Sequence, residues 1–448
     1  MKRLNLALLL VCFVLGAAAQ TGNPFSLEAA IEYAYQNSYT VKNAQINIAD
    51  AETQIDERRA GALPQVNGSA AYTRYLKLPA QALPEPFVQL IAASNGGELP
   101  PDFSREVSFF LKNNFTTGVG VNQAIFDGGI FTALEAARDY RSYVQAEVEV
   151  ARQNVRNQVT TAYLGPLILE ENAEFLQKNI DNVSELLRET RALYEAGFVE
   201  QLDVDRLQLS LSNLQTELDN LRRQRKIALN FLKMSMGYPI EEPITIEDDL
   251  DRLLQIATDE SILVQERSYR NRAEYTVITL GEQLNQANIR NIKSGYLPTL
   301  YGNAGYQWQF QGNTSDDAFW AETASIGVNL NVPIFDGFRR RSQIERAQLQ
   351  AQLLTNQRME LERAIDLEVV NARESYRNAA HRIEFQRSNL ELANRIYETA
   401  RIKYKEGVGS SIEVQQAEQS LFATQQNYTQ AAYDLVVAKS DLDRALGN

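Results

Sequence analysis

A six-residue motif occurs twice in this chain, once in each half. The first copy reads Ala124-Ile125-Phe126-Asp127-Gly128-Gly129, and the second reads Pro333-Ile334-Phe335-Asp336-Gly337-Phe338. Each copy ends a run in which apolar residues alternate with small or polar ones, and each begins a very long run with helical periodicity. Two copies in the same context predict a duplicated unit in which a strand leads into a long helix.

The motif itself predicts the junction between strand and helix. Asp127 and Asp336 are good N-cap residues, because a short carboxylate accepts hydrogen bonds from the free amides of the first helical turn. Phe126 and Phe335 precede them, at positions where a membrane strand could meet water. We therefore expect these four residues to mark two strand–helix junctions.

Other motifs recur at similar spacing and extend the repeat. Arg59–Pro64 matches Lys293–Pro298, 234 residues later, whereas the six-residue motif recurs after 209 residues and Tyr194–Gly197 recurs as Tyr404–Gly407 after 210. The first half therefore carries about 25 additional residues, within 78–113, where five prolines and a Gly-Gly pair predict a long hairpin loop.

Both halves are expected to contain a helix, two strands, a long helix and a shorter helix, in that order. The first unit is placed at 20–236, with its first helix from Ser26 to Ala60, strands at 66–75 and 115–125, the long helix at 129–196 and the last helix at 202–234. The second unit is placed at 263–448, with its first helix at 271–294, strands at 300–310 and 323–334, the long helix at 338–406 and the last helix at 412–446. An acidic, proline-containing connector at 237–262 joins them.

The amino terminus has the features of a secretory signal peptide at 1–19. A basic start is followed by a short apolar run and by Ala17-Ala18-Ala19, a suitable cleavage site. Cys12, the only cysteine, would leave with this segment, which is typical of an exported protein without disulfides or thiolate metal sites. The mature chain would carry 42 basic and 57 acidic residues, a balance that opposes nucleic-acid binding.

The predicted strands alternate between an apolar face and a small or polar face. In the second strand, Phe115, Val119, Val121 and Ile125 share one face. This alternation fits a membrane sheet with one face toward lipid, but a soluble, half-buried sheet would show it too. No segment after the signal peptide is long and apolar enough for a membrane helix, so entry into a membrane would require a closed β-barrel.

The long helices favour the membrane reading. Apolar residues step by four and three from Ile365 to Tyr404, and the same seam runs from Val155 to Tyr194, a pattern typical of coiled coils. Each helix has about 66 residues and a length of roughly 100 Å. Gly165-Pro166 interrupts the first seam, where an interior proline is expected to kink the helix at a cost of about 3 kcal/mol.

The sequence contains no pattern of catalytic or metal-binding residues. His381 is the only histidine, and it lies on a charged helix flank. Glu247-Asp248-Asp249 could hold a cation, although an acidic helix start explains it more simply. We therefore expect no catalytic residue, no cofactor and no metal ion.

The chain resembles the TolC family of outer-membrane efflux proteins over essentially its whole mature length. The resemblance is carried by the duplicated Gly-x-Leu-Pro, Ile-Phe-Asp-Gly and Tyr-x-x-Gly motifs, by Ser420–Gln426, and by the ending Asp441–Gly447. It implies a mostly α protein with membrane β-structure, a homotrimer whose twelve strands form one barrel in outer-membrane lipid, continued by an α-helical barrel through the periplasm. Four strands alone cannot close, which independently requires oligomerisation.

The resemblance also implies the working parts. The hairpin turns would be periplasmic tips that dock a periplasmic adaptor protein, which in turn joins an inner-membrane transporter. The matching docking residues are Gly197, Phe198, Val199, Gly407, Val408 and Gly409. The aperture candidates are Leu202, Asp203, Arg206, Ile412, Glu413 and Gln416.

One departure from the family concerns the aperture. Gln416 stands where the family often has aspartate, which puts a charge-ring gate in doubt, and Asp203 and Glu413 are possible substitutes. Ordinary packing roles for Ile412 and Leu202 are equally compatible with the pattern. The expected function is an outer-membrane exit duct for small molecules. Alternatives are a protein-secretion duct of the same fold and a periplasmic coiled-coil scaffold.

Overall fold

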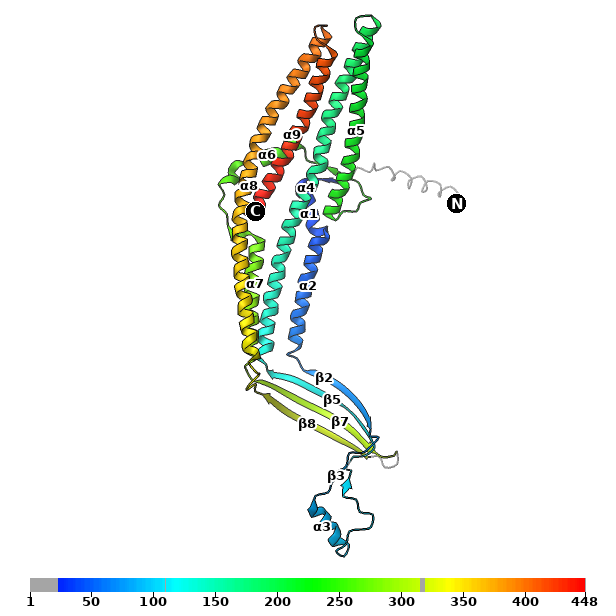
Figure 1. Ribbon diagram of the computed structural model, residues 1–448, viewed down its shortest axis with the longest axis vertical. Coiled ribbons are helices and arrows are strands. Elements are labelled where there is room, and N and C mark those ends of the chain that lie inside the picture. Colours follow the sequence, from blue (N-terminus) through cyan, green and yellow to red (C-terminus); the bar gives the residue numbers. More distant parts are fainter. Residues whose placement is uncertain (1–22, 109, 315–318, 448) are drawn as a thin grey trace, which may run out of the picture. The chain divides into compact units, whose positions relative to one another are not determined.

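The computed structural model describes residues 23–108, 110–314 and 319–447 (Figure 1). The predicted signal segment at 1–19 and Cys12 lie outside the described residues. The chain divides into two compact units. One takes in Met1–Asp50, Arg141–Glu282 and Leu353–Asn448, and the other takes in Ala51–Tyr140 and Gln283–Gln352.

The elements follow one another in the order helix, strands, long helix, helix, twice over. The helices are α1 Leu27–Asn37, α2 Tyr39–Ala60, α3 Glu85–Ser94, α4 Gly128–Glu195, α5 Gln201–Met236, α6 Leu250–Ala257, α7 Ala273–Ser294, α8 Arg339–Lys405 and α9 Ser411–Leu446. Short 3-10 turns span Glu260–Val264 and Tyr269–Asn271. The strands are β1 Asn23–Phe25, β2 Gln65–Arg74, β3 Gln81–Ala82, β4 Glu106–Val107, β5 Asn113–Phe126, β6 Ile244–Ile246, β7 Thr299–Gly312 and β8 Phe319–Asn331.

The main sheet is antiparallel, with strand order β2-β5-β7-β8. Its two halves join where β5 pairs with β7. Because residues directly opposite one another project to the same face, the register sorts the side chains into two faces. One face carries apolar rows such as Val66, Val121, Ala304, Ile326 and Tyr72, Phe115, Phe310, Trp320. The other carries polar and small rows such as Gln65, Asn122, Asn303, Gly327 and Asn67, Gly120, Gly305, Ser325.

The inner ends of the strands differ from the sequence prediction. The pairing of β5 with β7 shifts between Ala124 and Phe126, so Ile125 is an extra, bulged residue. The bulge brings Phe126 opposite Leu300 on the apolar face, where strict alternation would have placed it on the polar face. Ile125 lies over Gly302, which has no side chain to obstruct it.

The second copy of the motif lies outside its strand. The strand expected at 323–334 ends at Asn331, because Pro333 has no amide hydrogen for a ladder hydrogen bond. The long helix expected at 338–406 begins at Arg339, since Phe338 has a left-handed backbone with φ of 63°. Phe335 and Phe338 pack edge to face, with ring centroids 5.3 Å apart.

The segment 78–113 connects β2 to β5 and has structure of its own. Strands β3 and β4 pair antiparallel, with Gln81 opposite Val107. Helix α3 lies between them, and Pro86 occupies its first turn, where a missing amide hydrogen costs nothing. Phe87 and Leu90 on this helix are largely exposed.

The first helix is split in two. A single helix was expected from Ser26 to Ala60, but Ser38 is extended (ψ 139°) and separates α1 from α2. Gly237 packs against this break: a Cβ added to it would lie 2.5 Å from the carbonyl oxygen of Asn37. Close packing of the end of α5 therefore accompanies the break.

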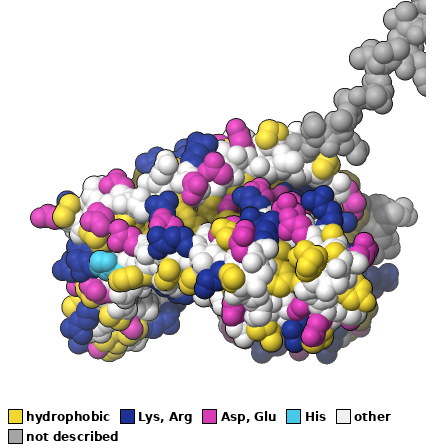
Figure 2. Space-filling model, turned by 90° about the horizontal axis from the view of Figure 1, so that it is seen from above, with side chains coloured by type: hydrophobic (Ala, Val, Ile, Leu, Met, Phe, Trp, Pro, Cys, Tyr) yellow, Lys and Arg dark blue, Asp and Glu magenta, His cyan; other side chains and the backbone are white. Residues whose placement is uncertain are grey.

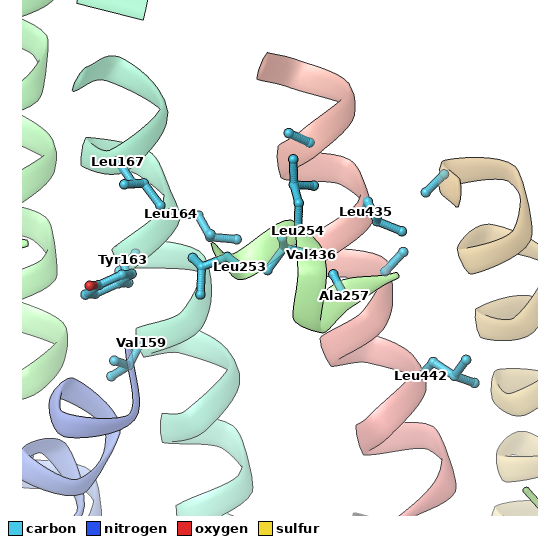
Figure 3. Close-up of a cluster of buried hydrophobic side chains, with 14 of the residues drawn as sticks. Val159, Tyr163, Leu164, Leu167, Leu253, Leu254, Ala257, Leu435, Val436 and Leu442 are labelled. Atoms are coloured by element: carbon cyan, nitrogen blue, oxygen red, sulfur yellow. The ribbon is translucent and has the colours of Figure 1, made fainter. Parts of the chain in front are cut away.

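The core of the larger unit lies where α6 packs among α1, α4 and α9 (Figure 3). Buried side chains come from three of these elements: Val159, Tyr163, Leu164 and Leu167 of α4, Leu253, Leu254 and Ala257 of α6, and Leu435, Val436 and Leu442 of α9. The Tyr163 hydroxyl lies within hydrogen-bond distance of two acceptors, the Phe25 carbonyl oxygen at 2.8 Å and the Asp248 carboxylate at 3.0 Å, and can donate to one of them at a time. Tyr163 thus joins the connector to α4, and the Tyr376 hydroxyl of α8 donates to the carbonyl oxygen of Ala257 in α6 at 2.7 Å.

The coiled-coil seams are buried over most of their length. In α8 the seam is buried at Ile365, Val369, Tyr376 and Tyr397, among others, which confirms the periodicity. In α4 it is buried at Val155, Val159, Leu176, Val183 and Thr190, among others, but Leu169 and Ala173 are only partly buried and Tyr194 is 41% exposed. Helix α4 continues through Pro166 without interruption.

Candidate functional site

Both hairpin turns are closed by left-handed glycines. Gly197 has φ of 81°, and its amide donates to Tyr194 O at 2.9 Å while the next amide, of Phe198, donates to Leu193 O at 2.9 Å. Gly407 has φ of 75° and repeats this pattern, donating to Tyr404 O at 3.0 Å. A left-handed residue ends a helix in this way and satisfies its last carbonyls, so the sequence repeat reflects a repeated turn.

The turns differ in what they expose. Phe198 and Val408 are 79% and 78% exposed, whereas Val199 and Gly409 are partly covered. A Cβ on Gly409 would lie 3.1 Å from the amide nitrogen of Tyr404, so this glycine allows a close approach to α8. Of the six docking candidates, Phe198 and Val408 therefore present the largest apolar side chains to solvent.

The first turns of α5 and α9 meet through a polar cluster. Ser411, only 2% exposed, donates to Asp203 and accepts a hydrogen bond from Arg206 at 3.3 Å. Arg206 also lies 3.8 Å from the Asp203 carboxylate. The structure thus joins two aperture candidates, Asp203 and Arg206, through a third residue that sequence reasoning missed.

The other four aperture candidates are exposed and lie outside this cluster. Leu202 and Ile412 are 50% and 43% exposed. Glu413 and Gln416 line a groove of about 490 Å³ between α8 and α9, together with Arg395, Ile396 and Lys403. Gln416 therefore faces its own hairpin partner.

Further buried polar contacts cross between the two halves. The Ser210 hydroxyl of α5 lies 3.0 and 2.9 Å from the two carboxylate oxygens of Glu418 on α9. Asn179 of α4 donates to Gln425 of α9 at 2.9 Å, and Thr429 of α9 donates to Asn172 of α4 at 2.9 Å. These residues stand at positions where packing helices usually present apolar side chains. A polar residue at such a position was therefore the sequence signal that could have indicated these contacts.

Burial changes the acidity of two groups in this region. Burial raises the pKa of Glu418 above its ordinary value, and the Ser210 hydroxyl opposes that rise. Burial also raises the pKa of Tyr397 to about 12, with a further contribution from the charge of Glu418. The Tyr397 hydroxyl has no hydrogen-bond partner among the described residues.

The two junction aspartates are both engaged. Asp127 accepts from the Gly129 amide at 2.8 Å and from the Tyr301 hydroxyl at 2.6 Å. Asp336 accepts from the Arg340 amide at 3.2 Å and from its guanidinium at 3.2 Å. Each carboxylate thus caps a long helix, and Tyr301 and Arg340 are partners that the sequence did not indicate.

The acidic connector acts as a structural joint. Asp249 caps α6 by accepting from the Arg252 amide at 2.7 Å, and Asp248 accepts from the Leu27 amide at 2.7 Å. Across the described residues, no group of three or more His, Cys, Asp or Glu side chains is placed to hold a metal ion. None of the described helices is long and apolar enough to span a membrane.

The surfaces around the tips mix charge with apolar groups. Figure 2 shows acidic and basic side chains intermingled with hydrophobic ones on the face seen from above.

Exposed apolar residues on α5 and α8 form a second set besides the buried seams. They include Leu202, Leu209, Ile227, Phe231 and Met234 on α5, and Phe385, Leu392, Ile396 and Ile402 on α8.

Comparison with known proteins identifies relatives along nearly the whole chain. The family model described as outer membrane efflux protein matches residues 30–238 and 271–448. The outer membrane protein TolC of Vibrio cholerae is 24% identical over 362 residues, covering 74% of this chain and 76% of that protein. The outer membrane efflux protein BepC of Brucella suis is 23% identical over 439 residues, with coverage of 94% and 85%. The pyoverdine export outer membrane protein OpmQ of Pseudomonas aeruginosa is 23% identical over 422 residues, again covering 94% and 85%.

Solved structures share the fold. The outer membrane protein VceC of Vibrio cholerae has a TM-score of 0.66 at 18% identity, covering 94% of this chain and 96% of its own. The open state of the MtrE outer membrane channel of Neisseria gonorrhoeae has a TM-score of 0.67 at 17% identity, covering 94% and 89%.

Proposed function

Since the chain belongs to the outer membrane efflux protein family and is an efflux duct of the outer membrane, we propose that three copies assemble around one pore. The observation that carries this proposal is the four-stranded sheet with one apolar and one polar face. Among the residues that the structure describes, strands β2 and β8 each have one edge without a partner strand. In lipid, such edges must be paired, and β2 of one copy would pair with β8 of the next.

The dimensions of the sheet suit a membrane. Leu300 and Phe310 are ten residue steps apart on the apolar face of β7, which corresponds to about 34 Å along the strand. At a tilt of about 40°, this length covers roughly 26 Å, close to the apolar band of outer-membrane barrels. The row formed by Tyr72, Phe115, Phe310 and Trp320 supplies aromatic side chains at one boundary.

Three copies fit a duct better than two. Two sheets would give eight strands, whose interior is filled by side chains, whereas twelve strands leave room for a lumen. The exposed apolar residues of α5 and α8 support the same ring, because each would be covered if α5 of one copy packed against α8 of the next.

The duct would work with a periplasmic adaptor and an inner-membrane transporter. Phe198 and Val408 are the exposed apolar tips that an adaptor would contact. Small-molecule efflux is favoured over protein secretion, since BepC is named for efflux and OpmQ for pyoverdine export. The cluster of Asp203, Arg206 and Ser411 would hold the tips of α5 and α9 together when no partner is docked.

Co-purification from the native envelope tests this assignment. Tagged wild-type chain should retain an adaptor and a transporter after mild cross-linking, and Val408→Asp should lose most of both. Val264→Asp is the matched control, because Val264 is 84% exposed but lies in the 3-10 turn Glu260–Val264 and not in a hairpin turn. Equal capture by Val408→Asp would refute the docking site, and recovery of wild-type chain in the soluble periplasmic fraction would favour the scaffold alternative.

A further inference from the structure

A buried carboxylate lies in the contact between α5 and α9, where its charge is poorly compensated. Glu418 is 4% exposed and belongs to helix α9. The residues that flank it and its partner Ser210 along their helices belong to one buried apolar cluster: Ala417 and Leu421 on α9, and Leu207 and Leu211 on α5. Burying an ionised carboxylate is costly unless it is paired with a cation or receives several hydrogen bonds.

The groups that face Glu418 do not supply that compensation. From α5, the Ser210 hydroxyl lies within hydrogen-bond distance of both carboxylate oxygens, but it has one hydrogen to donate. From α8, Tyr397 is buried with its hydroxyl unpartnered among the described residues. Two charged residues of the same helix, Arg401 and Glu398, affect the pKa of Tyr397. The Arg401 guanidinium is already paired with the Glu398 carboxylate at 3.1 Å.

We propose that Ser210 and Glu418 form a proton-linked clasp, which holds α5 and α9 together while Glu418 is protonated and loosens when it ionises. This inference rests on the proposed function, in which the tips of α5 and α9 separate when the duct opens. It adds a regulatory residue pair, joined across 208 positions of sequence, that belongs to neither the docking turns nor the Asp203 cluster.

The direction of the pH effect follows from the two environments. When α5 and α9 are packed together, burial raises the pKa of Glu418. Separation of α9 from α5 would return the carboxyl group to water and its pKa to the ordinary value of 4.5. The packed state therefore holds the proton more tightly, and its full stability is present below pH 4.5. That stability is lost as the pH rises toward the raised pKa of the packed state. Each unit of difference between the two pKa values changes the opening equilibrium by up to about tenfold.

Hydrogen–deuterium exchange of the purified full-length protein tests the clasp. Amide exchange in the first halves of α5 and α9 would be compared between wild type and Glu418→Gln at pH 4.5 and pH 7.5. Comparison at equal pH cancels the intrinsic exchange rate. We expect the ratio of wild-type to variant exchange to rise several-fold between the two pH values, because glutamine cannot ionise.

Two further variants test whether the pH effect comes from Glu418 and its contact with Ser210. Asp219→Asn makes the same acid-to-amide change on α5, at a side chain that is 65% exposed, and its ratio should not change with pH. Ser210→Ala removes the one donor that opposes the rise in the pKa of Glu418. Amide exchange in this variant should therefore exceed that of wild type by a larger factor at pH 7.5 than at pH 4.5. Ratios that stay constant with pH for both Glu418→Gln and Ser210→Ala would overturn the clasp. That outcome leaves the duct assignment intact, since capture of partners does not depend on it.

Discussion

The turn glycines show how single residues define the candidate site. Gly197 and Gly407 adopt positive φ at equivalent positions, with open space around both. Their conformation, rather than packing, explains why glycine suits them. Sequence reasoning could find them because a glycine after a long periodic run is itself a helix-end signal.

Proline at this turn should disrupt docking. Gly407→Pro fixes φ near −65°, opposite in sign to the observed 75°, and removes the amide that donates to Tyr404 O. We expect export to fall at least tenfold while trimer and membrane insertion persist. Substrate accumulation in cells and trimer mobility on native gels would measure these effects. Gly96→Pro, which creates the same misfit at φ of 79° in the 78–113 loop, is the control. Normal export by Gly407→Pro would remove the docking assignment.

Ser411 and Glu418 could not be found from sequence in the same way. Their partners, Asp203 and Ser210, lie in the other half of the chain, 208 residues away. To predict that these residues contact one another, one must know how far α5 is shifted along its axis relative to α9. The spacing between the repeated motifs does not give that shift. A polar residue in a helix seam indicates a buried contact, but not which residue completes it.

At the scale of elements, the sheet depends on close approach between β5 and β7. A Cβ on Gly118 would lie 2.6 Å from the carbonyl oxygen of Tyr306 and 3.0 Å from Cα of Gln307, both backbone atoms. Gly120 lies on the same face of β5, yet its nearest such contact is 4.0 Å, to Ala304 O. Of these two glycines, Gly118 therefore makes the closer approach to β7.

These two glycines give a matched pair of variants. Gly118→Ala should destabilise the sheet by roughly 1–3 kcal/mol, as overpacking does, and should lower the yield of folded trimer. Gly120→Ala should fold like wild type. Heat-modifiable gel mobility of the outer-membrane fraction measures both. Equal yields from the two variants would contradict the β5–β7 register.

Elements were easier to predict than their ends. Period-two and four–three patterns locate the strands and long helices because one face of each is apolar over many residues. The bulge at Ile125 and the early end of β8 depend on local backbone conditions instead. Pro333 offered a signal for the latter, whereas nothing in the residue pattern marked the bulge.

For the whole molecule, we propose a pore that is closed by contacts between its own helices. The fold class and family followed from duplicated motifs in a fixed order, and the family model confirms the resemblance. The assembly itself rests on unpaired strand edges and exposed apolar helix faces, which a single chain leaves uncovered.

Single-channel recording of the purified protein in planar bilayers tests whether contacts between the helices close the pore. Wild type should give discrete, small conductance steps if the contacts of Ser411 with Asp203 and Arg206, which join α9 to α5, hold the proposed aperture narrow. Asp203→Ala removes the acceptor and should raise the conductance several-fold. Asp205→Ala should not, because Asp205 is exposed and pairs within its own helix with Gln201. A pore closed by these contacts requires the higher conductance for Asp203→Ala, and absence of channels, or equal conductance for the two variants, would contradict it.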